Sequence, residues 1–138
     1  MFKNAGNVDY DNLLNKSIKL KKPLLLYFTG YACVNARKIE HNVLSENRIK
    51  EKLKNEFYFV SLYVDDRTAL FENERIKSET NGKLLKYVGQ KHSELQTRKF
   101  KSNSQPYFVI IDKNGNKVKD MGYTTEIELF NNFLNTNE

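Results

Sequence analysis

The residue with the clearest potential for chemistry is Cys33, the only cysteine in the 138-residue chain. It lies in the stretch FTGYACVNARKIE (28–40), where an apolar run gives way to helical spacing. At the start of a helix, unpaired backbone N–H groups and the helix dipole favour the thiolate that attacks disulfides. Ala36 stands three residues further on, where a Cys-x-x-Cys redox motif has its second cysteine. The stretch therefore contains half of a redox pair.

The neighbours of Cys33 in the sequence act in opposite directions on its thiolate. The charges of Arg37 and Lys38 favour it, whereas an ionised Glu40 nearby repels it, and no second thiol is available to hydrogen-bond the sulfur. We therefore expect Cys33 to be activated, but less than in a complete pair. A lone cysteine is also commonly a small buried apolar residue, so an inert Cys33 is the alternative.

Other residue types that could do chemistry give weaker signals. His41 and His92 have no cysteine or carboxylate at metal-ligand spacing, so no metal site is expected. A Cys33–His41 catalytic pair is disfavoured, because eight helical residues separate the two side chains by about two turns. Asp65 and Asp66 follow an apolar run and are expected to begin a solvated loop. No cofactor is expected.

The formal charge of +6 comes from 23 basic and 17 acidic residues, with the lysines scattered along the chain. Without a basic helix or a stacking motif, this pattern does not indicate a nucleic-acid partner. No apolar run reaches membrane-spanning length and the N-terminus is too polar for a signal peptide, so we expect a soluble chain. One cysteine forms no internal disulfide, but it can pair with another molecule, including Cys33 of a second copy on oxidation.

Apolar spacing predicts a single α/β domain over residues 1–138. A β-α-β unit with a right-handed crossover, followed by an antiparallel hairpin, predicts a four-stranded mixed sheet with helices on both faces. The expected strands are 24–28 (inside the sheet), 57–64, 107–111 and 118–123. The other expected parts are an N-terminal helix at 8–17, an active-site strand and helix within 24–54, a loop at 65–82, a helical insertion at 83–100, and a hairpin and helix at 107–135.

Three local signals refine these elements. Asn114-Gly115 is expected at the tip of the hairpin turn. Ser45 is expected to be the N-cap of a fresh helix that carries Ile49 and Leu53 on one face. Residues 125–128 match a capping box at the start of the last helix.

Three stretches together resemble the thioredoxin superfamily: FTGYACVNARKIE, the later LYVDD, and SNSQPYFVIID. The resemblance extends over nearly the whole chain. It is closer to the C-terminal thioredoxin-like domain of DsbD-type thiol:disulfide interchange proteins, whose members read Phe-Thr-Gly-Tyr, Cys-Val-Asn-Cys-Arg-Lys and Asn-Ser-Gln-Pro. It implies a thioredoxin-like three-layer fold and thiol–disulfide exchange.

The resemblance assigns roles to single positions. Cys33 matches the nucleophile, while Ala36 occupies the position of the resolving cysteine, which is the main departure from the family. Glu40 matches an acidic residue on the active-site helix that would tune the thiol or transfer a proton. Tyr27 stands where many relatives have a buried Asp, so that residue's role in proton transfer is not assigned. Pro106 matches the proline that is cis in thioredoxins and lies beside the nucleophile.

The same resemblance implies a substrate-binding surface. A trans bond is the usual state before proline, but the match implies a cis Gln105–Pro106 bond that would let Gln105 offer its peptide groups to an extended substrate segment. Pro106 would also keep metals away from the cysteine. Tyr31, Ala32 and Tyr107 would form an apolar rim around the sulfur. For both tyrosines, ordinary packing is an equal alternative.

The expected function is that of a thiol–disulfide oxidoreductase, in particular a reductase, in the periplasm or another extracytoplasmic compartment, with the cytoplasm as the alternative. Its expected partners are disulfide-containing or dithiol proteins, among them a transmembrane electron donor. With Ala36 the chain is expected to stall as a mixed disulfide. Ala36 is either a deliberate replacement of the resolving cysteine or natural. A non-catalytic peptide-binding domain and a monothiol enzyme are the alternatives.

Overall fold

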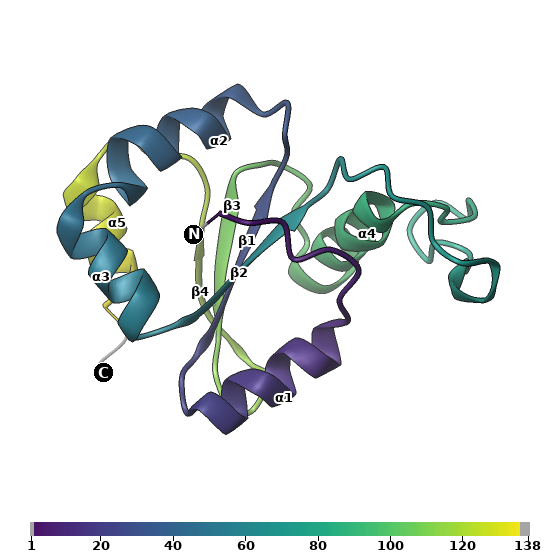
Figure 1. The fold of residues 1–138 in the computed structure, drawn as a ribbon, viewed down its shortest axis with the longest axis horizontal. Helices are drawn as coiled ribbons and strands as arrows, with labels where there is room; N and C mark the ends of the chain where they lie inside the picture. Colours follow the sequence, from purple (N-terminus) through teal and green to yellow (C-terminus); the bar gives the residue numbers. More distant parts are fainter. Residues whose placement is uncertain (1, 136–138) are drawn as a thin grey trace.

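A computed structural model describes residues 2–135 and has a four-stranded mixed sheet as its centre (Figure 1). The strand order is β2-β1-β3-β4, with β1 parallel to β2 and antiparallel to β3, and with β3 antiparallel to β4. The predicted mixed sheet, with residues 24–28 inside it, is therefore confirmed. The strands are β1 (Leu24–Thr29), β2 (Tyr58–Tyr63), β3 (Tyr107–Ile111) and β4 (Lys117–Met121).

Strand β1 is apolar throughout because both of its faces are covered. All six of its residues are buried, and alternate side chains enter two separate cores. Leu25 and Tyr27 pack against α2 (Val34–Ile39), α3 (Asn47–Asn55) and α5 (Ile127–Phe133). Leu24, Leu26 and Phe28 pack against α1 (Tyr10–Leu20) and α4 (Val88–Phe100). The result is the predicted arrangement of three layers, with helices on both faces (Figure 1).

The predicted helix caps were partly wrong. Ser45 is not an N-cap: its hydroxyl bonds the carbonyl of His41 in a π-helical turn, η1 (Glu40–Leu44), that continues α2. The N-cap of α3 is Glu46, whose side chain accepts a hydrogen bond from the N–H of Arg48 at 3.1 Å. The capping box at 125–128 is also absent, because α5 begins after Glu126. In the hairpin, Gly115 has a φ of 82°, as a tight turn tip requires.

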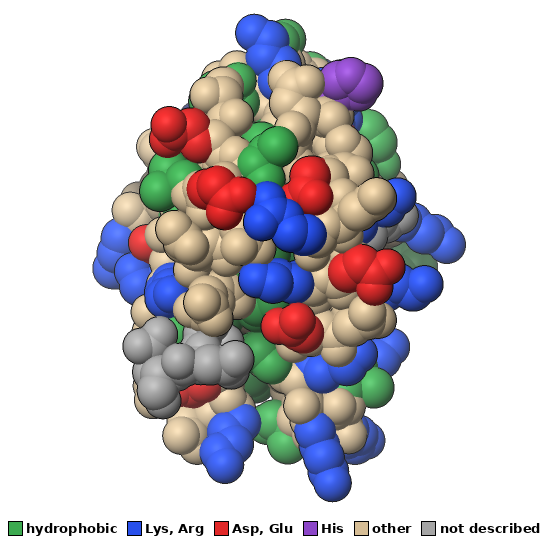
Figure 2. Space-filling view, turned by 90° about the vertical axis from the view of Figure 1, so that its left-hand side faces the viewer, with side chains coloured by type: hydrophobic (Ala, Val, Ile, Leu, Met, Phe, Trp, Pro, Cys, Tyr) green, Lys and Arg blue, Asp and Glu red, His purple; other side chains and the backbone are tan. Residues whose placement is uncertain are grey.

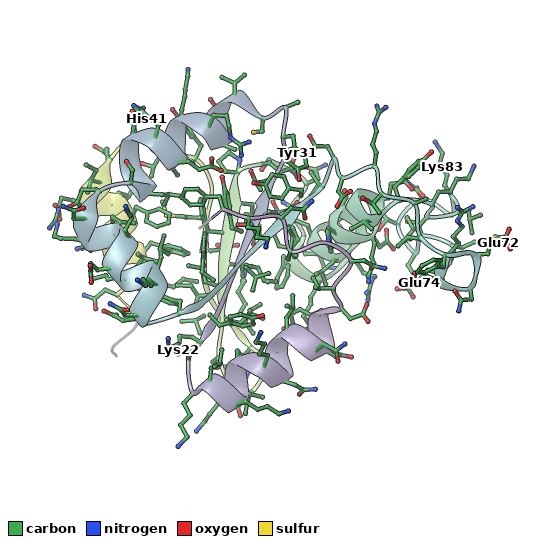
Figure 3. All side chains as sticks on the ribbon, viewed as in Figure 1. Lys22, Tyr31, His41, Glu72, Glu74 and Lys83 are labelled. Carbon is green, nitrogen blue, oxygen red and sulfur yellow. The ribbon has the colours of Figure 1, made fainter. Side chains whose placement is uncertain are left out.

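The segment between β2 and α4 differs most from the prediction. Residues 66–87 form an arm that extends from the body of the protein, with two isolated bridges (Ala69 to Tyr87 and Lys77 to Leu84) and a 3-10 turn, η2 (Glu72–Glu74). Figure 3 shows Glu72, Glu74 and Lys83 on this arm, away from Tyr31. The helix begins at Val88 instead of residue 83, because Leu85 packs with Leu70 in a small core of the arm's own.

Residues 2–9 form a second feature that the sequence did not predict, here called the N-terminal strap. Asn4 bridges in parallel to Ser61, and the N–H of Ala5 donates to the Ser61 carbonyl at 3.1 Å. The ring of Phe2 packs edge-on against Tyr27. The strap therefore covers the outer edge of β2, which would otherwise present unpaired backbone groups.

His92 on α4 bonds the N-terminal strap, and this contact predicts that the stability of the protein depends on pH. Its buried ring donates from Nε2 to the Gly6 carbonyl at 2.9 Å, and burial lowers the pKa of His92 below the usual 6.5. The unfolded chain therefore binds the extra proton first, so the free energy of unfolding should fall as pH decreases below about 6.5. Hydrogen bonds from Asn4 and Thr68 lower the pKa of the facing Asp66 although burial opposes this, so Asp66 stays ionised there.

Urea unfolding at about pH 7.5 and about pH 5.5 would measure this effect. His92→Gln keeps an N–H donor for Gly6 and should reduce the difference in the free energy of unfolding between the two pH values. His41→Gln, which changes the exposed histidine, should preserve it. An equal pH dependence in all three proteins would contradict the assignment.

The charges on the surface formed by α2, α3 and α5 are of both signs. Figure 2 shows basic and acidic side chains interspersed on the face of α2, α3 and α5. Arg48 on α3, for example, contacts Glu46 at 3.3 Å and Glu128 of α5 at 2.5 Å. Within residues 2–135, no helix is long and apolar enough to cross a membrane.

Candidate active site

Cys33 lies at the junction of β1 and α2. The chain turns after Thr29, with the N–H of Cys33 bonded to the Gly30 carbonyl at 3.2 Å, and Cys33 is the N-cap of α2. Its side chain is partly exposed. The thiol therefore stands at the start of a helix, as the sequence predicted, and is in part accessible to solvent.

The loop before β3 comes close to this thiol. The Gln105–Pro106 peptide bond is cis, and the Gln105 carbonyl oxygen lies 3.6 Å from the Cys33 sulfur. Antiparallel pairing explains the contact: Phe28 in β1 is opposite Tyr107 in β3, so the chain leaving β1 meets the chain entering β3. The structure thus brings Cys33, Gln105 and Pro106 together.

Asp65 holds the loop in front of Cys33. Its two carboxylate oxygens accept the backbone N–H groups of Tyr31 at 2.9 Å and Ala32 at 3.1 Å. A Cβ at Gly30 would lie 3.2–3.4 Å from this carboxylate, so glycine allows the close approach. Asp65 is exposed at the start of a loop, as expected, but its role in holding the loop before Cys33 was not predicted. Asp66 beside it is buried, so its expected place in a solvated loop was wrong. The contact between Asp65 and the loop before Cys33 could have been predicted, because the parallel strands β1 and β2 end at the same edge of the sheet and bring the segments that follow them together.

Asp65→Ala should free this loop without unfolding the protein. Two N–H groups would lose a charged acceptor, so local protection of the Tyr31 and Ala32 amides should fall by about tenfold or more. Amide hydrogen exchange at pH 7 measures this directly. Asp65→Asn keeps one carbonyl acceptor and should give an intermediate loss. Unchanged exchange in Asp65→Ala would show that the carboxylate does not hold the loop.

A partly buried polar network connects the helical segment that carries Arg37 and Glu40 to β1. The Tyr27 hydroxyl donates to Glu40 Oε2 at 2.6 Å, and Arg37 Nη2 contacts the same oxygen at 2.8 Å and Thr29 Oγ1 at 3.2 Å. Burial, together with the bond to Glu40, raises the pKa of Tyr27, so its hydroxyl stays protonated. Among residues 2–135, the hydrogen-bond partners of the Glu40 carboxylate are Tyr27 and Arg37, and Cys33 is not one of them.

Ala36 is 0% exposed and lies on the inner side of α2, in the turn that follows Cys33. Its methyl group packs in the core and offers no group that could exchange with a disulfide. The position three residues after Cys33 therefore carries a side chain without a thiol.

The expected rim is only partly present. Tyr31 is 57% exposed, stacks on Tyr63 with ring centres 4.2 Å apart, and accepts a hydrogen bond from Asn4 at 2.9 Å. Ala32 is also exposed. Tyr107, however, is buried in the core shared with α1 and α4, where its hydroxyl donates to Asp120 at 2.6 Å. Packing thus explains Tyr107, and its expected place on the rim was wrong.

Val34 is an exposed apolar residue next to Cys33 that the sequence reasoning did not name. It follows Cys33 directly and is 66% exposed. The exposure of Val34 could have been predicted from its position, because the first residue of a helix that begins beyond the end of a strand has few neighbours.

Comparison with known proteins agrees with this geometry. Residues 10–137 match the sequence profile of the family described as "Thioredoxin-like domain". The chain belongs to the thioredoxin-like domain family. No curated protein sequence matches it.

Solved structures share this thioredoxin-like fold at low sequence identity. A structure titled "DsbH Oxidoreductase" is 21% identical, with a TM-score of 0.62 over 97% of this chain and 87% of the other. A thioredoxin from Thermus thermophilus is 18% identical, with a TM-score of 0.64 over 97% and 85%. The reduced C-terminal domain of DsbD from Neisseria meningitidis is 11% identical, with a TM-score of 0.61 over 93% of each chain.

Proposed function

We propose that this thioredoxin-like chain is a thiol–disulfide oxidoreductase domain that reacts through Cys33 and stops at the mixed disulfide. The observation that carries the proposal is the position of the Cys33 sulfur, at a helix start and 3.6 Å from the Gln105 carbonyl. Beside the sulfur, the main chain of Gln105 is placed to receive an extended segment of a partner protein.

The reaction is a single exchange. The Cys33 thiolate attacks one sulfur of the partner's disulfide, so a Cys33–S bond forms as the partner's S–S bond breaks. The second partner sulfur leaves with the electron pair and takes a proton from solvent. Cys33 is thereby oxidised to a mixed disulfide, and half of the partner's disulfide is reduced to a thiol.

Ala36 determines the fate of this mixed disulfide. A second cysteine at this position would attack Cys33 and release the partner, but a methyl group performs no such step. The chain therefore acts as a reductant that is trapped after one reaction, unless a soluble thiol resolves the mixed disulfide. A peptide-binding domain without chemistry is the competing function, and it requires Cys33 to be inert.

The proposed partners are disulfide-containing or dithiol proteins, and a transmembrane electron donor would suit the reductase direction. Oxidation without a partner would join two copies through Cys33. An oxidising compartment such as the bacterial periplasm would supply the disulfides. The resemblance to DsbD-type domains supports the proposed partners and the proposed compartment.

The test is the rate at which Cys33 forms a mixed disulfide with a disulfide-bonded peptide, followed by intact mass. The folded protein should react at least about tenfold faster than the same chain in urea, because only the folded chain places the thiol at the helix start. Cys33→Ala should show no mass increase. Equal rates in the folded and unfolded chain would favour the binding domain.

A further inference from the structure

The loop that faces Cys33 depends on one buried glutamine of α4. Gln96 is 0% exposed, and burying an amide is costly unless its polar atoms are hydrogen-bonded. Its Nε2 donates to the Ser104 carbonyl at 2.8 Å and to Ser102 Oγ at 3.2 Å. Its Oε1 accepts from Gln105 Nε2 at 2.8 Å. All three contacts of the amide are thus made with residues 102–105.

Residues 102–105 make few other hydrogen bonds. The Ser102 N–H donates to the Gln96 carbonyl at 3.4 Å, Gln105 Nε2 also donates to the Asn103 carbonyl at 3.5 Å, and the Gln105 carbonyl accepts from the Cys33 thiol at 3.6 Å. Residues 102–105 lie between α4 and β3, outside any helix or strand. The chain reverses at Lys101, whose φ is 57°, and this turn carries the loop back over Gln96. The contacts of Gln96 therefore hold the loop in place.

The loop in turn sets the geometry at the sulfur. Gln105 is held through its side chain by Gln96, and its carbonyl oxygen faces Cys33 at 3.6 Å. A displacement of about 1 Å in a positioning element can change a reaction rate by about a hundredfold. Gln96 does not contact the thiol, so any effect that it has on the reaction must pass through this loop.

We propose that Gln96 is a positioning residue, which fixes the main chain of Gln105 so that an extended peptide disulfide docks with its sulfur against Cys33. This rests on the proposed function. Small disulfides need no such docking. Loss of Gln96 therefore impairs the reaction with peptide disulfides selectively.

Two probes with the same leaving group test this inference. One is an extended peptide whose central cysteine is disulfide-bonded to 2-nitro-5-thiobenzoate, and the other is free cysteine with the same group. Attack by Cys33 on the cysteine sulfur expels the coloured nitrothiobenzoate thiolate, so both rates are read by absorbance. In Gln96→Leu the peptide rate should fall by about tenfold or more, while the small-probe rate changes by less than about twofold.

Gln90→Leu is the matched control on the same helix. The Gln90 side chain accepts from the backbone N–H groups of Lys86 and Tyr87 at the other end of α4, so this change also removes hydrogen bonds but leaves the loop intact. Its ratio of peptide to small-probe rates should equal that of the unchanged protein. Gln96→Glu keeps the acceptor for Gln105 and loses the two donations, so its ratio should be intermediate.

Each outcome is decisive. Equal losses with both probes, or no loss with either, would overturn the role of Gln96, as would failure of both Gln96 variants to fold by circular dichroism. If the unchanged protein is alkylated by iodoacetamide but reacts with neither disulfide, the proposed function fails instead.

Discussion

Replacing Ala36 by cysteine should turn a protein that reacts once with a disulfide into one that turns over. The new thiol would lie on the turn of α2 that follows Cys33, where it can attack the mixed disulfide within the same molecule. Intramolecular attack has a very high effective concentration, so the yield of reduced substrate per chain should rise by about a hundredfold or more. Cys33→Ala should remove even the first reaction.

Reduction of insulin, followed by turbidity with dithiothreitol as the final reductant, measures this turnover. Because dithiothreitol is itself a soluble thiol that releases mixed disulfides, the rate with the unchanged chain is subtracted as the background for Ala36→Cys. Because position 36 is fully buried, the melting temperature of Ala36→Cys should be compared with that of the unchanged chain. A folded Ala36→Cys protein without turnover would support the peptide-binding alternative. Turnover by the unchanged chain in glutathione would identify a monothiol enzyme.

Gly89→Ala should destabilise the protein, although alanine is normally the better helix residue by about 1 kcal/mol. A Cβ at this position would lie 2.4 Å from the Val64 carbonyl oxygen and 2.6 Å from the Asp66 nitrogen. Both are backbone atoms, so no side-chain rotation relieves the clash. The start of α4 would have to move and lose the bond from the Gly89 N–H to the Asp66 carbonyl, now 2.9 Å.

We expect a loss of about 1–3 kcal/mol in the free energy of unfolding, measured by urea denaturation. Ser93→Ala, one turn further along α4, is the control and should change stability by less than about 0.5 kcal/mol. A gain in stability for Gly89→Ala would mean that α4 does not pack as closely against the end of β2.

The central strands could be predicted from the sequence because their uniformly apolar runs have a single physical cause. Leu24–Phe28 and Tyr107–Ile111 are uniformly apolar because both faces of the central strands are covered. Cys33 was found from its residue type and its place where an apolar run gives way to helical spacing, and the loop at Gln105–Pro106 was found through a resemblance over nearly the whole chain. Helical spacing alone misplaced the start of α4, because Leu84 and Leu85 also fit the arm, where short bridges replace helical bonds.

The remaining site residues could not be predicted from local patterns. Asp65 lies in the LYVDD stretch, but its partners are far away in the sequence, and Gln96 lies outside the three stretches that carry the resemblance, with partners in the loop that follows its helix. Asp65, for example, contacts Tyr31 and Ala32, which precede it in the sequence by 34 and 33 residues. The roles of such residues depend on which chain segments meet at one edge of the sheet. Tyr107 shows the converse, since the resemblance placed it on the rim, whereas both faces of β3 are covered and its ring is buried.

The N-terminal strap has a practical consequence for handling the protein. Asn4 bonds both Tyr31 and Asp66, so the first residues run beside the loop that carries Cys33 (Figure 1). An affinity tag or a surface linker attached at this end would crowd the reactive face and compete with the strap for the edge of β2. For immobilised assays, an engineered anchor on the hairpin at Asn114, at the opposite end of the strands, would leave that face free.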